Sequence, residues 1–337
     1  MATYCFQLYP HANIRYRESL QALGRAELAC LLDACGVEAD IQVQKIGGCT
    51  FLTFEAEGLT NQQWAVLCRH SATLMICRKE DDVLIPLEKP EPMYLPEDLA
   101  ELLKYKGKTS AMFTKMMINC ALCASDFLAV KAPVVLDPMC GRGTTCFTAL
   151  QSGMNAVGLD CDRRDLKETA DYFSRYLQFH KLKHGLKQGS RTVKGTSVPE
   201  AIYTLADTKE HYQAGDTRSL TLLLGDTGLT GELMRKTPAH ILVADLPYGV
   251  QHAPQDGRRA EAFPQLMRRA LKSWHAALKP GGAMALSFNI LTFPRGQLKT
   301  LVEEAGFTLV DQAYDHRYEH FVEQAVTRDV LIARKER

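Results

Sequence analysis

A short turn near the middle of the chain has the residue types and spacing of a ligand-binding loop. The apolar run Val134–Leu136 ends in Asp137, and Gly141 and Gly143 follow, one residue apart. Glycine has no Cβ, so such a turn can adopt positive φ angles and let a ligand lie against bare backbone. A helical pattern opens at Thr144, and a helix N-terminus beside such a loop adds unpaired N–H groups.

The side chains of this turn favour a cationic ligand over a pyrophosphate. A dinucleotide-binding loop has a third glycine, where this chain has Cys146. The acid before the loop attracts positive charge, such as the amino acid end of S-adenosylmethionine (SAM). We therefore expect a SAM contact surface made of Asp137, Cys140, Gly141, Gly143 and Thr144.

A second apolar run about a hundred residues later delivers an acid, a proline and an aromatic ring to one loop. The run from His240 is followed by Asp245, Leu246, Pro247 and Tyr248. One chemistry that suits these groups is activation of the exocyclic amino group of a base, which is a poor nucleophile because its lone pair is conjugated into the ring. The Asp245 carboxylate and the Leu246 carbonyl can each accept one N–H, which turns the lone pair outward. The proline limits the loop's φ, and the tyrosine ring offers a face on which an extruded base can stack.

The two motifs together resemble those of the THUMP-type RNA guanine-N2 methyltransferases, which include the tRNA guanine-10 enzymes. The first reads Asp-Pro-x-Cys-Gly-x-Gly-Thr from Asp137, and the second resembles the Asp-Pro-Pro-Tyr motif of enzymes that methylate amino groups of bases. The resemblance covers about residues 105–335. The family usually has proline at the position of Leu246. Leucine at this position still provides a backbone carbonyl that can accept an N–H.

Two more acids follow apolar runs and are candidates for the nucleoside part of the cofactor. Asp160 ends the run from Asn155, where a carboxylate accepts ribose hydroxyls, with Asp162 as the alternative. Asp226 follows the run Leu220–Leu224 and can accept from the adenine amino group, a role that the resemblance also implies. Asp216 competes for that assignment.

A pair of hydroxyl residues precedes the helical pattern that starts near residue 112. In the related enzymes this segment covers the methionine end of SAM, so the resemblance implies that Thr109 and Ser110 reach its carboxylate. Helix capping is an equally good interpretation, because Ser and Thr are preferred N-cap residues.

The alternation of strand and helix patterns predicts an α/β fold: a Rossmann-like class I methyltransferase sheet preceded by a small ferredoxin-like α+β domain. We expect the ferredoxin-like domain, for substrate binding, at residues 1–88, a proline-rich linker at 89–104 and the SAM-dependent methyltransferase domain at 105–337. The resemblance also implies a THUMP domain, for which about 85 residues leave no room. Residues 187–218 have no clear period and are predicted to form a long inserted loop.

Composition indicates an ordinary globular protein. The 337 residues are 46% hydrophobic and 23% charged, with a net charge of +1. The absence of a signal peptide pattern and of a long apolar run predicts a cytoplasmic protein without membrane contact. The eleven cysteines, an odd number without a repeating spacing, favour reduced thiols, and no metal is expected. Lysine and arginine gather near residues 104–108, 181–194 and 258–272, where each group is a candidate phosphate contact or a solvated face.

These patterns predict an enzyme that transfers a methyl group from SAM to N2 of guanine in structured RNA. We expect tRNA as the partner, with ribosomal RNA as a second possibility, and the resemblance allows for a small activator subunit. The alternatives are a DNA methyltransferase acting on N6 of adenine or N4 of cytosine, and a non-catalytic subunit that binds SAM and RNA.

Overall fold

A computed structural model describes residues 1–10, 14–89, 93–105, 107–247, 262–310 and 318–337. Contacts divide the chain into two compact units, residues 1–92 with 313–330, and residues 93–312 with 331–337. The predicted boundaries at residues 88 and 105 do not include the return of 313–330 to the first unit. Tyr318 illustrates this return, because its hydroxyl lies 3.0 Å from Sγ of Cys30.

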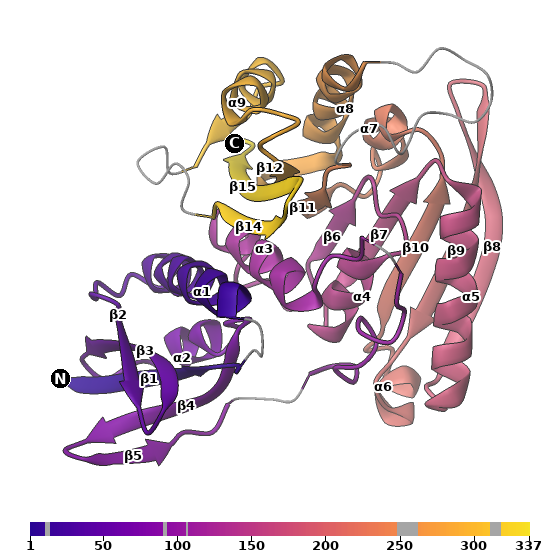
Figure 1. Ribbon diagram of the computed structural model, residues 1–337. Coiled ribbons are helices and arrows are strands. Elements are labelled where there is room, and N and C mark those ends of the chain that lie inside the picture. Colours follow the sequence, from indigo (N-terminus) through magenta and orange to yellow (C-terminus); the bar gives the residue numbers. More distant parts are fainter. Residues whose placement is uncertain (11–13, 90–92, 106, 248–261, 311–317) are drawn as a thin grey trace. The chain divides into compact units, whose positions relative to one another are not determined.

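The first unit is an antiparallel sheet with two helices (Figure 1). Its sheet has the order β2-β3-β1-β4-β5. The elements in chain order are β1 (Ala2–Leu8), α1 (Ile14–Ala34), β2 (Gln42–Ile46), β3 (Cys49–Ala56), α2 (Asn61–Leu67), β4 (Thr73–Glu80) and β5 (Val83–Pro86). This is the predicted ferredoxin-like order β-α-β-β-α-β with one more strand at the edge. The returning segment also forms strand β14 (His320–Glu323), which is not part of this sheet and pairs antiparallel with β15 (Val326–Arg334).

The second unit is built on a parallel sheet whose central order is β12-β11-β6-β7-β10. These strands are β6 (Val134–Asp137), β7 (Asn155–Asp160), β10 (Arg218–Leu224), β11 (Ala239–Asp245) and β12 (Leu278–Asn289). Strand β15 (Val326–Arg334) lies between β12 and the short β13 (Thr308–Leu309), with which it pairs antiparallel. The predicted α/β class is confirmed: this is an open, Rossmann-like sheet.

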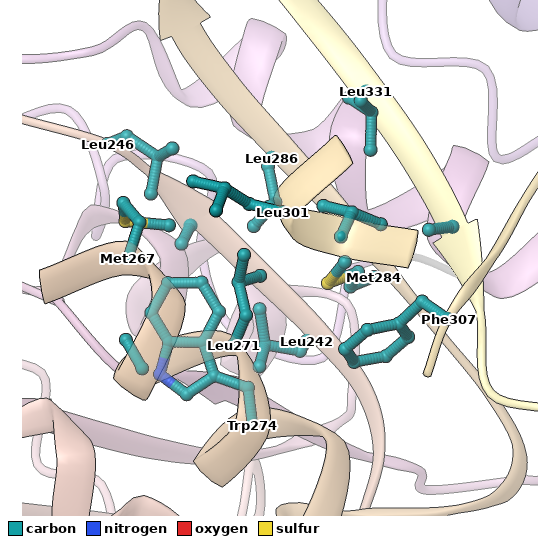
Figure 2. Packing of buried hydrophobic residues seen from close by; sticks show 14 of the residues in the cluster. Leu242, Leu246, Met267, Leu271, Trp274, Met284, Leu286, Leu301, Phe307 and Leu331 are labelled. Atoms are coloured by element: carbon teal, nitrogen blue, oxygen red, sulfur yellow. The ribbon is translucent and has the colours of Figure 1, made fainter. Parts of the chain in front are cut away.

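Helices cover both faces of this sheet (Figure 1). On one face lie α3 (Ala111–Cys123), α4 (Thr144–Gln151) and α5 (Arg163–Phe179); on the other lie α7 (Thr230–Leu233), α8 (Phe263–Ala277) and α9 (Arg295–Glu304). Figure 2 shows the core under α8 and α9, where Trp274 packs among Leu242, Leu271 and Met284. Within the described ranges, no helix is both long and apolar enough to cross a bilayer.

The prediction of a long loop at residues 187–218 is wrong. The chain forms a hairpin of β8 (His184–Val193) and β9 (Thr196–Leu205), followed by α6 (Lys209–Ala214). Strand β9 pairs antiparallel with β10, so the hairpin widens the sheet. The turn residues Lys194 and Gly195 have φ of 48° and 78°, as a two-residue type I′ turn requires. Strand β8 is mostly exposed, which explains its polar composition.

Candidate active site

Three of the predicted acids meet at the carboxyl edge of the parallel sheet. Asp137, Asp160 and Asp245 end the strands β6, β7 and β11. Asp137 is 3% exposed, and burial raises its pKa to about 7, with the charges of Asp160 and Asp245 adding to the effect. A carboxylate placed this way is poised to pair with a cation. This edge is also where open α/β sheets bind their ligands.

The loop after β6 has the geometry that its glycines predict. Gly141 and Gly143 have φ of 48° and 81°. None of the described atoms lies within 4 Å of where a Cβ on Gly141 would stand, whereas a Cβ on Gly143 would come within 2.9 Å of Thr169. The second glycine thus allows the loop to pack on α5, and the first leaves bare backbone exposed to a ligand. This space suits a cofactor lying along the loop.

Asp160 holds this loop in place. Its Oδ2 accepts a hydrogen bond from the Gly141 N–H at 2.8 Å, and its Oδ1 accepts one from the Asp162 N–H at 2.8 Å. Burial raises the pKa of Asp160, and the two N–H groups oppose that effect. Each carboxylate oxygen can accept a further bond, so the proposed ribose contact is compatible with this geometry. Asp162 itself caps α5, accepting from the N–H of Arg164 at 2.7 Å.

Cys140 packs under the loop beside Cys146. A Cβ on Gly158 in β7 would lie 2.8 Å from Sγ of each cysteine. The hydrogen bond to the Cys146 thiol and burial raise the pKa of Cys140, so its thiol is neutral near pH 7. Its side chain packs beneath the loop, and the expected contact of Cys140 with the cofactor stays a prediction.

Two residues that sequence reasoning missed fix the other side of the loop. The Tyr105 hydroxyl lies 3.0 Å from Oγ1 of Thr144, at the first residue of α4. The guanidinium of Arg142 stacks on the Tyr105 ring, 4.9 Å from its centre, and pairs with Asp165 and Glu168 at 3.0 Å each. The sequence does contain signals for both residues. Tyr105 is an aromatic residue shortly before Thr109 and Ser110, and Arg142 is a cation between the two glycines of the loop.

The two hydroxyl residues before α3, Thr109 and Ser110, have different surroundings, and their predicted contact with SAM stays a prediction. Ser110 is the N-cap residue of α3 but makes no side-chain capping bond, so the capping alternative does not apply to it. The Thr109 hydroxyl donates a hydrogen bond to Oδ2 of Asp245, which brings this segment to the second motif.

The second motif is anchored by its leucine. Leu246 is 1% exposed and packs in the core with Met267 and Leu286 (Figure 2). Its N–H donates to the Ser287 carbonyl at 2.8 Å. A proline at position 246 would have no N–H for this bond. The leucine therefore supplies by packing and hydrogen bonding the rigidity that a second proline would give. Tyr248 lies outside the described residues.

Asp226 lies two residues after β10 and pairs with Arg269. Its Oδ2 accepts from Arg269 at 2.9 Å and its Oδ1 from the Gly228 N–H at 2.7 Å. The Arg269 guanidinium lowers the pKa of Asp226. The competing Asp216 pairs with Lys131 at 3.1 Å and with Arg218 at 2.7 Å. The adenine contact of Asp226 stays a prediction, and a bound adenine would share this carboxylate with Arg269.

The basic groups are partly neutralised. Arg191 pairs with Glu200, Lys194 pairs with Glu232, and Lys108 lies 3.6 Å from Glu101. In the described part of the chain, no three His, Cys, Asp or Glu side chains form a metal-binding group.

No family model matches the chain, and no curated protein matches it in sequence. Among solved structures, it is similar to TrmN from Thermus thermophilus, with 18% identity over 90% of this chain and a TM-score of 0.42. The match spans 64% of TrmN. It is also similar to the rRNA methyltransferase aviRa from Streptomyces viridochromogenes (14% identity, 70% of this chain and 89% of that one, TM-score 0.41). A TehB-like SAM-dependent methyltransferase from Corynebacterium glutamicum has 14% identity over 63% of this chain and 84% of its own, with a TM-score of 0.37.

Proposed function

We propose that this protein is a SAM-dependent methyltransferase that modifies N2 of guanine in structured RNA, with tRNA as the first candidate substrate. The observation that carries the proposal is the meeting of the two motifs at one sheet edge. Strand β6, which ends in Asp137, lies between β7 and β11, which end in Asp160 and Asp245. A group that would hold the cofactor and a group that would hold the base are therefore neighbours.

The residues around the glycine loop fit SAM. Asp137 offers a buried carboxylate for its ammonium group, Asp160 offers acceptors for the ribose, and Gly141 leaves the space in which the cofactor would lie. When bound, SAM supplies an electrophilic methyl group on a sulfonium. Ser110, Cys140, Thr144 and Asp226 are the other expected contacts.

At the second motif, Asp245 accepts one N–H of the exocyclic amino group and the Leu246 carbonyl accepts the other. The amino lone pair then points away from both acceptors. The Leu246 bond to Ser287 and its core packing fix the backbone of this pair. Holding donor and acceptor atoms in line is worth several orders of magnitude in rate. The base must be extruded to reach this loop, and Tyr248 is the proposed stacking partner.

The test is methyl transfer from labelled SAM to unmodified tRNA, ribosomal RNA and DNA, followed by mass spectrometry of the nucleosides. N2-methylguanosine from RNA alone supports the proposal. Methylated adenine or cytosine from DNA would move the protein to the amino methyltransferases of DNA, whose catalytic loop has the same chemistry. Absence of any product would favour a non-catalytic subunit, or an enzyme that needs an activator subunit.

Asp245→Ala tests the site within that experiment. We expect it to abolish methyl transfer and leave the Kd for SAM within about threefold, because the acid serves the base. Asp171→Asn, an exposed acid on α5, is the matched control and should behave as wild type. A large loss of SAM affinity in Asp245→Ala would reassign Asp245 to the cofactor.

A further inference from the structure

A side-chain contact joins the segment before α3 to the acid that ends β11. The Thr109 hydroxyl donates to Oδ2 of Asp245, across 136 residues of sequence. Thr109 is 8% exposed, and a buried hydroxyl is most stable when it donates to a partner. Because the acceptor is a carboxylate, this bond is of the stronger, charge-assisted kind.

The backbone of Asp245 is already fixed by its neighbours. It is the last residue of β11, aligned with Ser287 of β12, and the next N–H is bonded to the Ser287 carbonyl. What strand pairing leaves undetermined is the rotation of the carboxylate, since χ2 of aspartate is broad. A donor held at one carboxylate oxygen removes that freedom. Threonine suits this task, because its β-branched side chain is stiff at χ1.

We propose that Thr109 is a positioning residue for Asp245, which orients the carboxylate toward the amino group of the base, and is not a contact of the SAM carboxylate. This inference rests on the proposed function. The first prediction from the sequence gave Thr109 to the cofactor, and the two roles differ in what they do to binding and to turnover.

The test compares Thr109→Val, Thr109→Ser and Thr114→Val in the full chain, measuring kcat and the Kd for SAM. Valine keeps the shape of threonine and removes the hydroxyl. Loss of a hydrogen bond to a charged group corresponds to a fall in kcat of about 10- to 100-fold, with the Kd for SAM within about threefold. Serine keeps the hydroxyl and should restore most of the rate.

Thr114→Val is the matched control. Thr114 is a buried threonine of α3 whose hydroxyl donates to the Ser110 carbonyl at 3.0 Å. An equal fall in kcat in this variant would mean that any buried hydroxyl of α3 matters, and would overturn the specific role of Thr109. A Thr109→Val variant with weakened SAM binding and unchanged kcat at saturating SAM would return the residue to the cofactor.

A double-mutant cycle tests the contact without any methyl transfer. Thr109→Val, Asp245→Ala and the double variant are unfolded in denaturant, and their midpoints are compared. Residues in direct contact are non-additive, so the second substitution should change the midpoint much less in the background of the first. Additive midpoints would overturn the inference. A non-additive cycle together with a wild-type protein that methylates nothing would support the contact and refute the proposed function instead.

Discussion

Asp137→Asn should make the ligand-free protein more stable at pH 8 while it weakens SAM binding. Burial raises the pKa of Asp137 from an ordinary 3.8 to about 7. The folded state therefore keeps a proton that the unfolded state releases, and stability falls as pH rises from 4 to 7 and is level above that. At about 1.4 kcal/mol per pH unit, ionised Asp137 costs the folded protein about 4 kcal/mol at pH 8. Asparagine has nearly the same shape and no charge, and its oxygen can still accept from the Met139 N–H.

The assay is the free energy of unfolding in urea at pH 4, 6 and 8 for the two proteins. The difference should be near zero at pH 4 and grow to a few kcal/mol in favour of the variant at pH 8. Asp216→Asn is a control of opposite sign, because Arg218 and Lys131 lower the pKa of Asp216 to about 2. That variant should lose stability at pH 8. Equal pH dependence in Asp137→Asn and wild type would refute the account of Asp137 as a buried acid held ready for a cation.

Three further substitutions test the supports of the site. Leu246→Ala should lower the free energy of unfolding by about 2–5 kcal/mol, because it leaves a cavity in the core; urea unfolding measures this, and a loss below 1 kcal/mol would contradict the anchoring role. Gly158→Ala places a Cβ 2.8 Å from two thiol sulfurs, so it should lower Tm, and adding Cys146→Ala should recover part of the loss; no recovery would place the strain elsewhere. Tyr105→Phe removes the hydroxyl that contacts Thr144. We expect this variant to fold normally and to bind SAM more weakly by calorimetry; an unchanged affinity would show that the Tyr105 hydroxyl does not support the SAM site.

The parts of this molecule that local sequence determines were predictable. The strands that end in Asp137, Asp160 and Asp245 are short apolar runs bounded by turn residues, and their parallel pairing places the acids at one edge. The positive φ angles of Gly141 and Gly143 follow in the same way from residue type. Each of these inferences needs only neighbours within a few positions.

The contacts of the polar side chains were not predictable, because they join distant segments. The resemblance assigned Thr109 to the cofactor, and nothing in the neighbouring sequence indicates that β11 brings Asp245 to its hydroxyl. The Asp226 carboxylate was likewise expected to be available to adenine, and Arg269 arrives from a helix 43 residues later. Such pairs form only when the helices and the sheet pack together, and the pattern of residues within a single helix or strand does not predict them.

The hairpin of β8 and β9 was missed for a different reason. Its outer strand is an edge with most side chains in water, so it lacks the apolar alternation that marks a half-buried strand. The signal that was present is the dipeptide Lys194-Gly195, since glycine favours the positive φ of a tight turn. The signal is weak because the first turn position has lysine, whereas Asn or Asp is more common there.

The return of residues 313–330 to the first unit has a consequence for the order in which the protein can fold during synthesis. Strand β15 runs across the division, with residues 326–330 in the first unit and 331–334 in the second. Its second part lies inside the sheet, between β13 and β12. Neither unit is therefore complete until the ribosome has made this strand. A protein whose N-terminal domain folds first has one complete domain before the rest of the chain is made, whereas here both units are completed by the same strand, β15.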